Sequence, residues 1–208
     1  DQDISDINLS PNNDYGKSKL LAEKELELWK NANSSRLLKI IRPTAVFGYG
    51  SLGNTNRFFR TVINNRFIFI GNKYKKKSLC YVDNLVNFII FCDNFENSLK
   101  SNYVDKPDLT LFEIVQIINK NKYKKQMFNL AFIDIPFSLF NFVFKFFHYI
   151  DLIKYLIKDL SYERINRISS DSVFEGINKD LTFKPNIPIT SAIITEVQKY
   201  QNDETNSL

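Results

Sequence analysis

The feature of the sequence that most constrains its fold is the alternation of helical patterns with short apolar runs. Residues 14–33 form a helical pattern of good helix formers, with neither proline nor glycine after Gly16. A polar turn then leads to LLKIIRP, an apolar run typical of a buried strand. A helix followed closely by such a strand is half of a parallel crossover unit. The sequence therefore predicts an α/β fold with a parallel sheet.

The alternation continues along the rest of the chain. Thr110 is expected to cap a helix that carries Glu113, and the stretch TAVFGYGSLGNT, with three of the six glycines, is predicted to be a loop. The last residues, QNDETNSL, are expected to fray. No repeat or interdomain linker is evident, which favours a parallel-sheet half followed by a smaller α/β lobe. The further helices are predicted over 56–65, 84–95, 109–121, 135–160 and 190–200, and the strands over 66–70, 79–82, 102–104 and 127–130.

Composition and charge indicate a folded chain with few clues to its partners. The sequence is 44% hydrophobic and contains 19 Phe and 10 Tyr, whereas disordered chains are poor in both classes. Its net charge of +5 is concentrated in two basic runs, 73–77 and 120–125. We interpret these runs as solvated loops, with an anion site for phosphate as the alternative. Basic and aromatic residues together do not make a nucleic-acid binder, and no nucleic-acid partner is predicted.

The metal-binding residue types are sparse. Cys80 and Cys92 lie in no metal-ligand spacing, and the single histidine, His148, has no partner ligand nearby in the sequence. We therefore predict no metal site. The two isolated cysteines favour a reducing compartment, and the acidic start of the chain is unlike a signal peptide, so a cytoplasmic protein is expected.

One segment has a membrane-like composition. In residues 135–160 the longest uncharged run, Ile135–Phe144, is well short of the roughly 20 residues that span a membrane. Charged residues recur there every three or four positions, which places them on one stripe of a helix. We interpret the segment as an amphipathic helix packed on a core, with association to a membrane surface as the alternative.

Tyr15 and Lys19 form the strongest candidate for catalysis. They lie four positions apart on the predicted first helix, so their side chains project from the same face. An ammonium group close to a phenol favours the phenolate, and such a pair can take a proton from a sugar or alcohol hydroxyl. In a chain with ten tyrosines and many lysines this spacing is expected about once by chance, so an ordinary surface helix is the alternative.

Three sequence blocks together resemble a known family. YGKSKLLAE, then IIRPTAVFG, then SLCYVDNLV resemble, in order and spacing, the second half of the extended short-chain dehydrogenase/reductase family. The similarity is to the NAD-dependent epimerases and dehydratases that act on nucleotide sugars. The later run TLFEIVQII, MFNLAF and FKPNIPIT resembles the substrate lobe of members that build polysaccharides.

The resemblance implies the architecture of the chain. Residues 1–100 would be mainly the C-terminal part of a Rossmann-type doubly wound parallel sheet, and residues 101–208 mainly a substrate-binding lobe, with the two interleaved. The N-terminal βαβ units of the family, with their glycine-rich dinucleotide loop, have no counterpart here. This favours a piece of a longer protein over a natural relic, and we expect the chain alone to bind NAD poorly and to turn over no sugar.

The resemblance also implies roles for the residues of the first helix and strand. Tyr15 would be the catalytic acid/base, and Lys19 would bind the nicotinamide ribose. Pro43 and the backbone through Val46 would lie beside the nicotinamide. The implied cofactor is NAD, with NADP open because the residue that selects between them lies in the part without a counterpart here.

Substrate contacts are implied further along the chain. Asn54 and Arg57 lie in the loop that meets the nucleotide in relatives. Lys77 stands where many members have an arginine toward the diphosphate; lysine keeps the charge without the bidentate fork. Ala45 replaces an asparagine that holds the diphosphate in many sugar epimerases, so no particular sugar is assigned.

The expected function is that of a 4-epimerase-like enzyme of surface polysaccharide synthesis with a nucleotide-sugar substrate, and a homodimer is left open. A keto-sugar reductase of the same family is the first alternative. A non-catalytic protein that binds partners or a membrane surface is the second.

Overall fold

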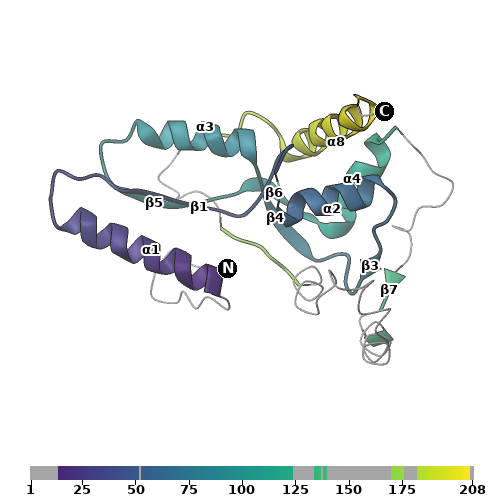
Figure 1. The fold of residues 1–208 in the computed structure, drawn as a ribbon, viewed down its shortest axis with the longest axis horizontal. Helices are drawn as coiled ribbons and strands as arrows, with labels where there is room; N and C mark the ends of the chain where they lie inside the picture. The colour runs from purple at the N-terminus through teal and green to yellow at the C-terminus, as the bar shows by residue number, and fades with distance from the viewer. Residues whose placement is uncertain are drawn as a thin grey trace.

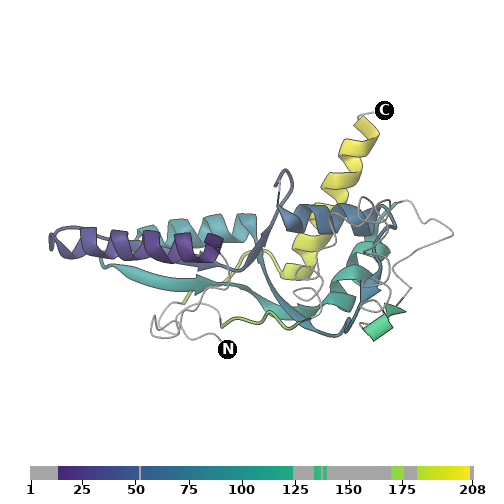
Figure 2. The same cartoon turned by 60° about the horizontal axis from the view of Figure 1, so that its bottom comes forward.

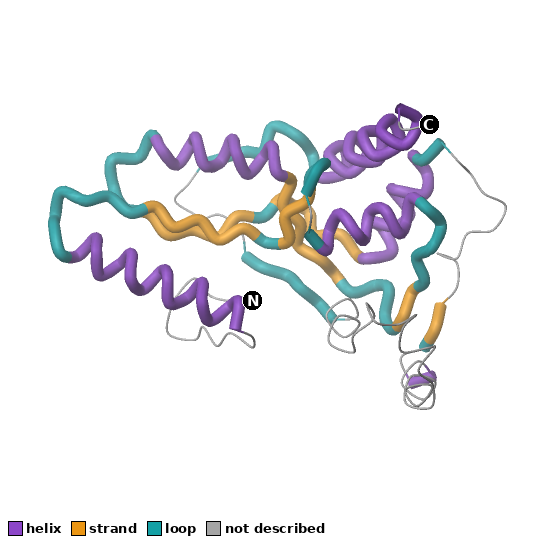
Figure 3. The backbone as a smooth tube through the Cα atoms, in the orientation of Figure 1, coloured by secondary structure: helices purple, strands orange, loops and turns teal. Residues whose placement is uncertain are grey.

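A computed structural model describes residues 14–51, 53–123, 134–136, 138–139, 170–175 and 182–206. Helices and strands alternate along most of this length, as Figures 1 and 3 show. The helices are α1 (Asp14–Asn31), α2 (Asn54–Ile63), α3 (Val82–Asp93), α4 (Leu111–Asn121) and α8 (Ile189–Asn206). The strands are β1 (Lys39–Pro43), β2 (Ala45–Phe47), β3 (Phe69–Ile70), β4 (Lys76–Tyr81), β5 (Leu99–Tyr103), β6 (Asp105–Thr110) and β7 (Asp134–Ile135).

Three of the four strand pairings are parallel, as the alternating pattern predicted. β1 pairs with β5 from Lys39 opposite Leu99 to Pro43 opposite Tyr103. β2 pairs with β4, and β3 with β7, in the same sense. The exception is β6, which the sequence did not predict and which runs antiparallel to β4. It follows β5 after one residue and leads directly into α4.

The elements gather in two groups. α1 and α3 run alongside the β1–β5 pair, whereas α2, α4 and α8 gather around the β2–β4–β6 sheet (Figures 1 and 2). The larger apolar core lies in the second group, where the rings of Phe47 and Phe59 stack with centroids 5.5 Å apart. The smaller core lies under α3, where Phe88 stacks on Tyr103 at 4.7 Å. Each group therefore has its own apolar interior.

Local sequence signals account for two helix starts. Thr110 accepts a hydrogen bond from the backbone of Glu113, whose carboxylate in turn accepts from the Thr110 backbone at 2.7 Å. This capping box confirms the predicted cap of α4. α3 begins immediately after β4, two residues earlier than expected, with Asp83 in its first turn.

Several sequence predictions were wrong in their bounds. The predicted loop 44–55 contains β2, because its apolar residues Val46 and Phe47 pair with β4. α8 continues through Asn206, so residues 201–206 of the expected frayed tail are helical. Ile135 belongs to β7 rather than to a helix. The predicted strand 127–130, most of the amphipathic segment 135–160 and His148 lie outside the described residues.

The two basic runs are not simply solvated loops. Lys75 forms an ion pair with Asp171 at 2.7 Å, and Lys77 is half-buried and donates to the backbone oxygen of Ser170. Lys122, from the second run, is buried, and burial lowers its pKa. It donates to Asn65 and to the Val62 backbone oxygen at the end of α2, where a cation complements the helix dipole. The prediction of two solvated loops was wrong at these lysines.

A buried carboxylate joins the two groups. Asp105, at the start of β6, accepts hydrogen bonds from the Tyr81 backbone at 2.6 Å, the Tyr103 hydroxyl at 2.8 Å and the Asn84 amide at 3.0 Å. Asn84 also donates to and accepts from the backbone of Ile187, just before α8. β4, β5 and α3 therefore meet at the Asp105 side chain, and Asn84 links the entry to α8 to it.

We expect Asp105→Asn to destabilise the chain by about 1–3 kcal/mol, because the amide that replaces one oxygen leaves a buried donor without an acceptor. Chemical denaturation would measure the change. Asp93→Asn is the matched control, since Asp93 is 87% exposed and its contact with Lys39 is long at 3.4 Å. We expect that control to change stability by less than about 0.5 kcal/mol.

The loss of stability in Asp105→Asn, relative to the parent protein, should also depend on pH. Burial raises the pKa of Asp105 above its ordinary value of 3.8, against the opposing effect of its three hydrogen bonds. The folded chain therefore binds the carboxyl proton of Asp105 more tightly than the unfolded chain does. The stabilisation by Asp105 then falls as pH rises from the ordinary pKa to the raised pKa of the folded chain. A deficit of Asp105→Asn that grows with rising pH would contradict this assignment.

Candidate functional site

The side chains of Tyr15 and Lys19 lie close together on α1. The Lys19 ammonium nitrogen is 5.4 Å from the centre of the Tyr15 ring, which confirms that the four-residue spacing puts both on one face. Tyr15 is 73% exposed, so its hydroxyl is open to a reacting group.

Charged side chains attach α1 to the sheet. No residue of α1 is buried, so apolar packing contributes little to its position. The Arg42 guanidinium of β1 donates its Nε to both carboxylate oxygens of Glu23, at 2.9 and 3.1 Å. Lys100 of β5 pairs with Glu27 at 2.5 Å. The side chains of Arg42 and Glu23 are only 18% and 19% exposed, and a bidentate pair of this kind also fixes orientation.

The spacing along α1 fixes where Tyr15 and Lys19 lie. Tyr15, Lys19, Glu23 and Glu27 follow one another at intervals of four and share one stripe of the helix. Glu27 is held by Lys100, the second residue of β5, and Glu23 by Arg42, the fourth residue of β1. Lys19 and Tyr15 are therefore carried past Pro43, to the carboxyl ends of both strands. Ligands of open parallel sheets bind at this edge.

The segment after β1 is the one predicted to lie beside the nicotinamide. Pro43 is exposed at the strand end and Val46 is half-buried in β2. Between them, the Thr44 backbone donates to the Tyr103 oxygen at 3.1 Å, which continues the strand pairing. The Thr44 hydroxyl is buried and has no hydrogen-bond partner in the described part of the chain. A polar ligand group such as a carboxamide would satisfy it.

The predicted substrate residues lie in the second group of elements. Asn54 is the first residue of α2 and Arg57 follows one turn later, both exposed. Lys77 lies in β4, where burial lowers its pKa more than the nearby Asp171 raises it. No hydrogen bond or ion pair given for the described residues links these three side chains to Tyr15 or Lys19.

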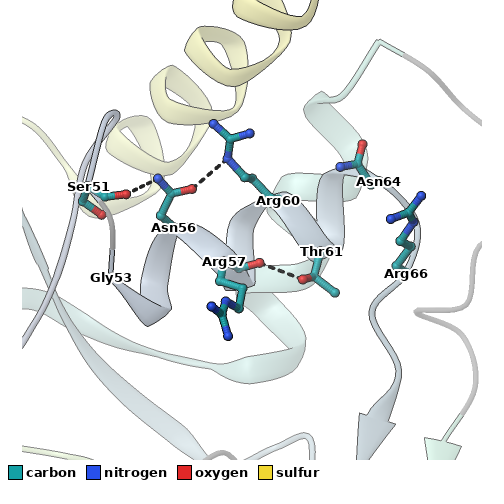
Figure 4. Close-up of a pocket in the computed structure, with 8 residues that line it drawn as sticks. All are labelled: Ser51, Gly53, Asn56, Arg57, Arg60, Thr61, Asn64 and Arg66. Atoms are coloured by element: carbon teal, nitrogen blue, oxygen red, sulfur yellow. Dashed lines mark hydrogen bonds between the residues drawn. The ribbon is translucent and has the colours of Figure 1, made fainter. Parts of the chain in front are cut away.

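Arg57 also borders a groove along the outer face of α2 (Figure 4). The groove encloses about 370 Å³ and includes two further arginines, Arg60 and Arg66, that the sequence analysis did not single out. Its lining is completed by Ser51, Gly53, Asn56, Thr61 and Asn64.

Sequence reasoning also missed Glu23, Glu27 and Thr44. The four-residue spacing from Tyr15 to Glu27 was visible in the sequence and could have identified both glutamates. Their partners Arg42 and Lys100 come from two strands far apart in the chain, and only the fold pairs them.

The described residues contain no group of three His, Cys, Asp or Glu side chains placed to hold a metal ion. In the same part of the chain, every helix is too short or too polar to cross a membrane.

Sequence comparison identifies relatives of the first half of the chain. Residues 1–103 match the model of the NAD dependent epimerase/dehydratase family. A stretch of 120 residues is 38% identical to the N-acetyl-α-D-glucosaminyl-diphospho-ditrans,octacis-undecaprenol 4-epimerase of Escherichia coli O157:H7, covering 55% of this chain and 36% of that protein.

Solved structures of similar fold cover nearly the whole chain. The UDP-glucose 4-epimerase of Thermotoga maritima, solved with UDP-glucose, gives a TM-score of 0.65 at 13% identity over 94% of this chain and 55% of that one. The UDP-glucuronic acid 4-epimerase of Bacillus cereus, in complex with NAD, gives 0.61 at 13% identity over 95% and 53%. The chain thus has the Rossmann-type α/β fold and spans about half the length of these enzymes.

We expect Glu23→Gln to loosen α1, because the amide keeps the shape of the side chain and loses the charge that faces Arg42. The loss should be about 1–3 kcal/mol of stability. The substitution should speed amide hydrogen exchange more in residues 14–31 than elsewhere in the chain.

Asp14→Asn provides the control, since the carboxylate of Asp14 is fully exposed and its contact with Lys17 is 3.4 Å long. An exposed pair of this kind contributes about 0–1 kcal/mol. Equal effects of the two substitutions on α1 would contradict the assigned role of Glu23.

Proposed function

Because residues 1–103 place this chain in the NAD-dependent epimerase/dehydratase family, we propose that the protein is a 4-epimerase-like enzyme acting on a sugar attached to a diphosphate. Surface polysaccharide synthesis is the proposed role. The observation that carries the proposal is the Tyr15–Lys19 contact at the carboxyl ends of β1 and β5. Two charged contacts, from Arg42 and Lys100, hold α1 in place. This helix carries the Tyr15 phenol with the Lys19 ammonium group beside it.

Each residue of the pair has a distinct proposed task. The Tyr15 hydroxyl takes the proton from the reacting sugar hydroxyl and later returns it, as a general base and then a general acid. Lys19 supports the negative charge that forms on the phenol and donates a hydrogen bond to the ribose of the cofactor. The rigid placement of α1 holds both groups in register with the sheet edge.

The proposed cofactor is NAD, with NADP open. Bound cofactor supplies the hydride transfer, which no side chain of this chain can supply. Lys19, the Pro43–Val46 segment and the buried Thr44 hydroxyl are the residues that would hold its nicotinamide end. The phosphate-binding glycine loop of the family has no counterpart in the printed sequence.

Two carriers for the sugar are compatible with the relatives. The Thermotoga maritima structure contains a nucleotide sugar, UDP-glucose. The Escherichia coli relative is named for a sugar on a polyprenyl diphosphate, and it is 38% identical over the aligned stretch. A diphosphate is common to both carriers. Lys77, Asn54 and Arg57 remain the proposed substrate residues, with Lys77 already bound to the Ser170 backbone.

We expect Tyr15→Phe to lower kcat of the intact protein about 10²–10⁴-fold, the usual contribution of general acid–base catalysis. KM for the sugar diphosphate should change little, because the phenyl ring is retained. Epimerisation of UDP-N-acetylglucosamine and of the corresponding polyprenyl diphosphate would be followed by chromatography of the products.

Tyr74→Phe is the matched control, since Tyr74 is 62% exposed in the basic loop and should leave kcat unchanged. Full activity of Tyr15→Phe on both substrates would refute the proposed role. Stoichiometric consumption of NADH or NADPH, instead of turnover with catalytic NAD, would assign the protein to the keto-sugar reductases of the family.

We also propose two features of the assembly. The first is the division into a Rossmann part, 1–100, and a substrate lobe, 101–208, and the second is a homodimer. The interleaving is supported by β6 and α4 packing with β4 and α2. The homodimer is supported by Leu21 and Leu28, which are seven residues apart on α1 and 62% and 64% exposed. Light scattering that shows only monomer would exclude the dimer.

A further inference from the structure

One aromatic side chain of α8 joins two other parts of the chain. Tyr200 is only 5% exposed. The centre of its ring lies 5.4 Å from that of Tyr49, edge to face, in the loop before α2, and 6.2 Å from that of Phe59 in α2. The Arg60 guanidinium carbon lies 5.4 Å from the same ring, within the range of a cation–π contact, and Figure 4 shows this side chain extending toward α8. Tyr200 therefore contacts both the loop and the helix that follows it.

α8 provides a fixed surface for these contacts, because one side of it is buried in the larger core. One turn before Tyr200, the buried carboxylate of Glu196 accepts hydrogen bonds from the Tyr81 hydroxyl at 3.2 Å and from Lys199 at 2.9 Å. The helix continues beyond Tyr200 through Asn206. Tyr200 therefore lies inside a packed helix rather than at its end.

The loop between β2 and α2 leaves the core after a close contact. A Cβ atom on Gly48 would lie 2.4 Å from a methyl carbon of Val82, so this approach requires glycine. The backbone then turns at Gly50, which is exposed and has a φ of 83°. Between these two glycines, Tyr49 is 40% exposed and packs its ring on Tyr200. This ring contact attaches the exposed part of the loop to α8.

The same ring is connected to the start of α2. Arg60 donates its Nε to the Asn56 side-chain oxygen at 3.0 Å, and the Asn56 amide donates to the Ser51 backbone oxygen (Figure 4). Two of the proposed substrate residues, Asn54 and Arg57, lie in this first turn of α2. A change at the α8 ring would therefore reach both the loop and the turn that carries these two residues.

We propose that Tyr200 is a positioning residue for the substrate site. Its ring holds loop 48–53 and the first turn of α2 where Asn54 and Arg57 meet the substrate. This inference rests on the proposed function and adds to it a residue from the far end of the chain. Tyr200 acts through Tyr49 and Arg60 and has no assigned contact with the sugar. Its loss should therefore weaken substrate binding more than it slows the chemical step.

The test compares variants of the intact protein on UDP-N-acetylglucosamine and on the corresponding polyprenyl diphosphate. Tyr200→Leu removes the ring and should raise KM about tenfold, with kcat within about threefold of the parent. Tyr200→Phe keeps the ring contacts and should leave KM within about twofold of the parent. Amide hydrogen exchange in residues 48–57 should become faster in Tyr200→Leu and stay unchanged in Tyr200→Phe.

Ile118→Ala is the matched control for lost stability. Ile118 is fully buried in the same core but lies in α4, and its truncation leaves a cavity that destabilises the chain. With the loss of stability measured by chemical denaturation, this variant should keep the parent's KM and the parent's exchange in residues 48–57. Equal effects of Ile118→Ala and Tyr200→Leu on KM would overturn the proposal. A Tyr200→Phe variant that behaves like Tyr200→Leu would overturn it as well.

Tyr49→Leu tests the same contact from the side of the loop, and it decides the proposal if Tyr200→Leu does not fold. It should raise KM and speed exchange in residues 48–57, because it removes the ring that packs on Tyr200. Since both substitutions remove one shared contact, the double variant should raise KM no further than Tyr200→Leu alone. Additive effects of the two substitutions would contradict the proposal.

Failure of the proposed function would be seen separately. If the parent protein converts neither sugar diphosphate, the epimerase assignment fails, and exchange in residues 48–57 still decides whether Tyr200 holds the loop. If the parent is active and Tyr200→Leu keeps its KM, the positioning role alone is refuted.

Discussion

The buried carboxylate of Asp105 is the interaction on which the arrangement of the two groups depends. A carboxylate removed from water must be satisfied by donors, and here the donors come from the end of β4, the end of β5 and the start of α3. Asn84 extends the network to the segment that leads into α8. The carboxyl ends of β4 and β5 are thereby held in one place.

The hydrogen bonds of Asp105 also position the strands next to the candidate active site. β5 pairs with β1, and α1 is attached to both strands by Arg42–Glu23 and Lys100–Glu27 rather than by apolar packing. Charged contacts are more directional than hydrophobic ones, so they fix the rotation of α1 about its axis. The rotation decides which stripe faces the sheet edge, and on this helix it is the stripe that carries Lys19 and Tyr15.

The second group of elements uses its charges differently. Lysines of the two basic runs are satisfied by backbone oxygens and by Asp171, which fixes β4 and the end of α2. None of the eight described residues that line the α2 groove is an aspartate or a glutamate.

The sequence by itself determined the α/β class, the parallel pairing and the shared face of Tyr15 and Lys19, because these follow from local periodicity and from a four-residue spacing. It also identified the capping box of α4, a purely local signal. Only the tertiary structure decided β6, the burial of Lys122 and the partners of Glu23, Asp105 and Arg60. These depend on contacts between residues far apart in the chain, and neither spacing nor composition encodes which distant groups will meet.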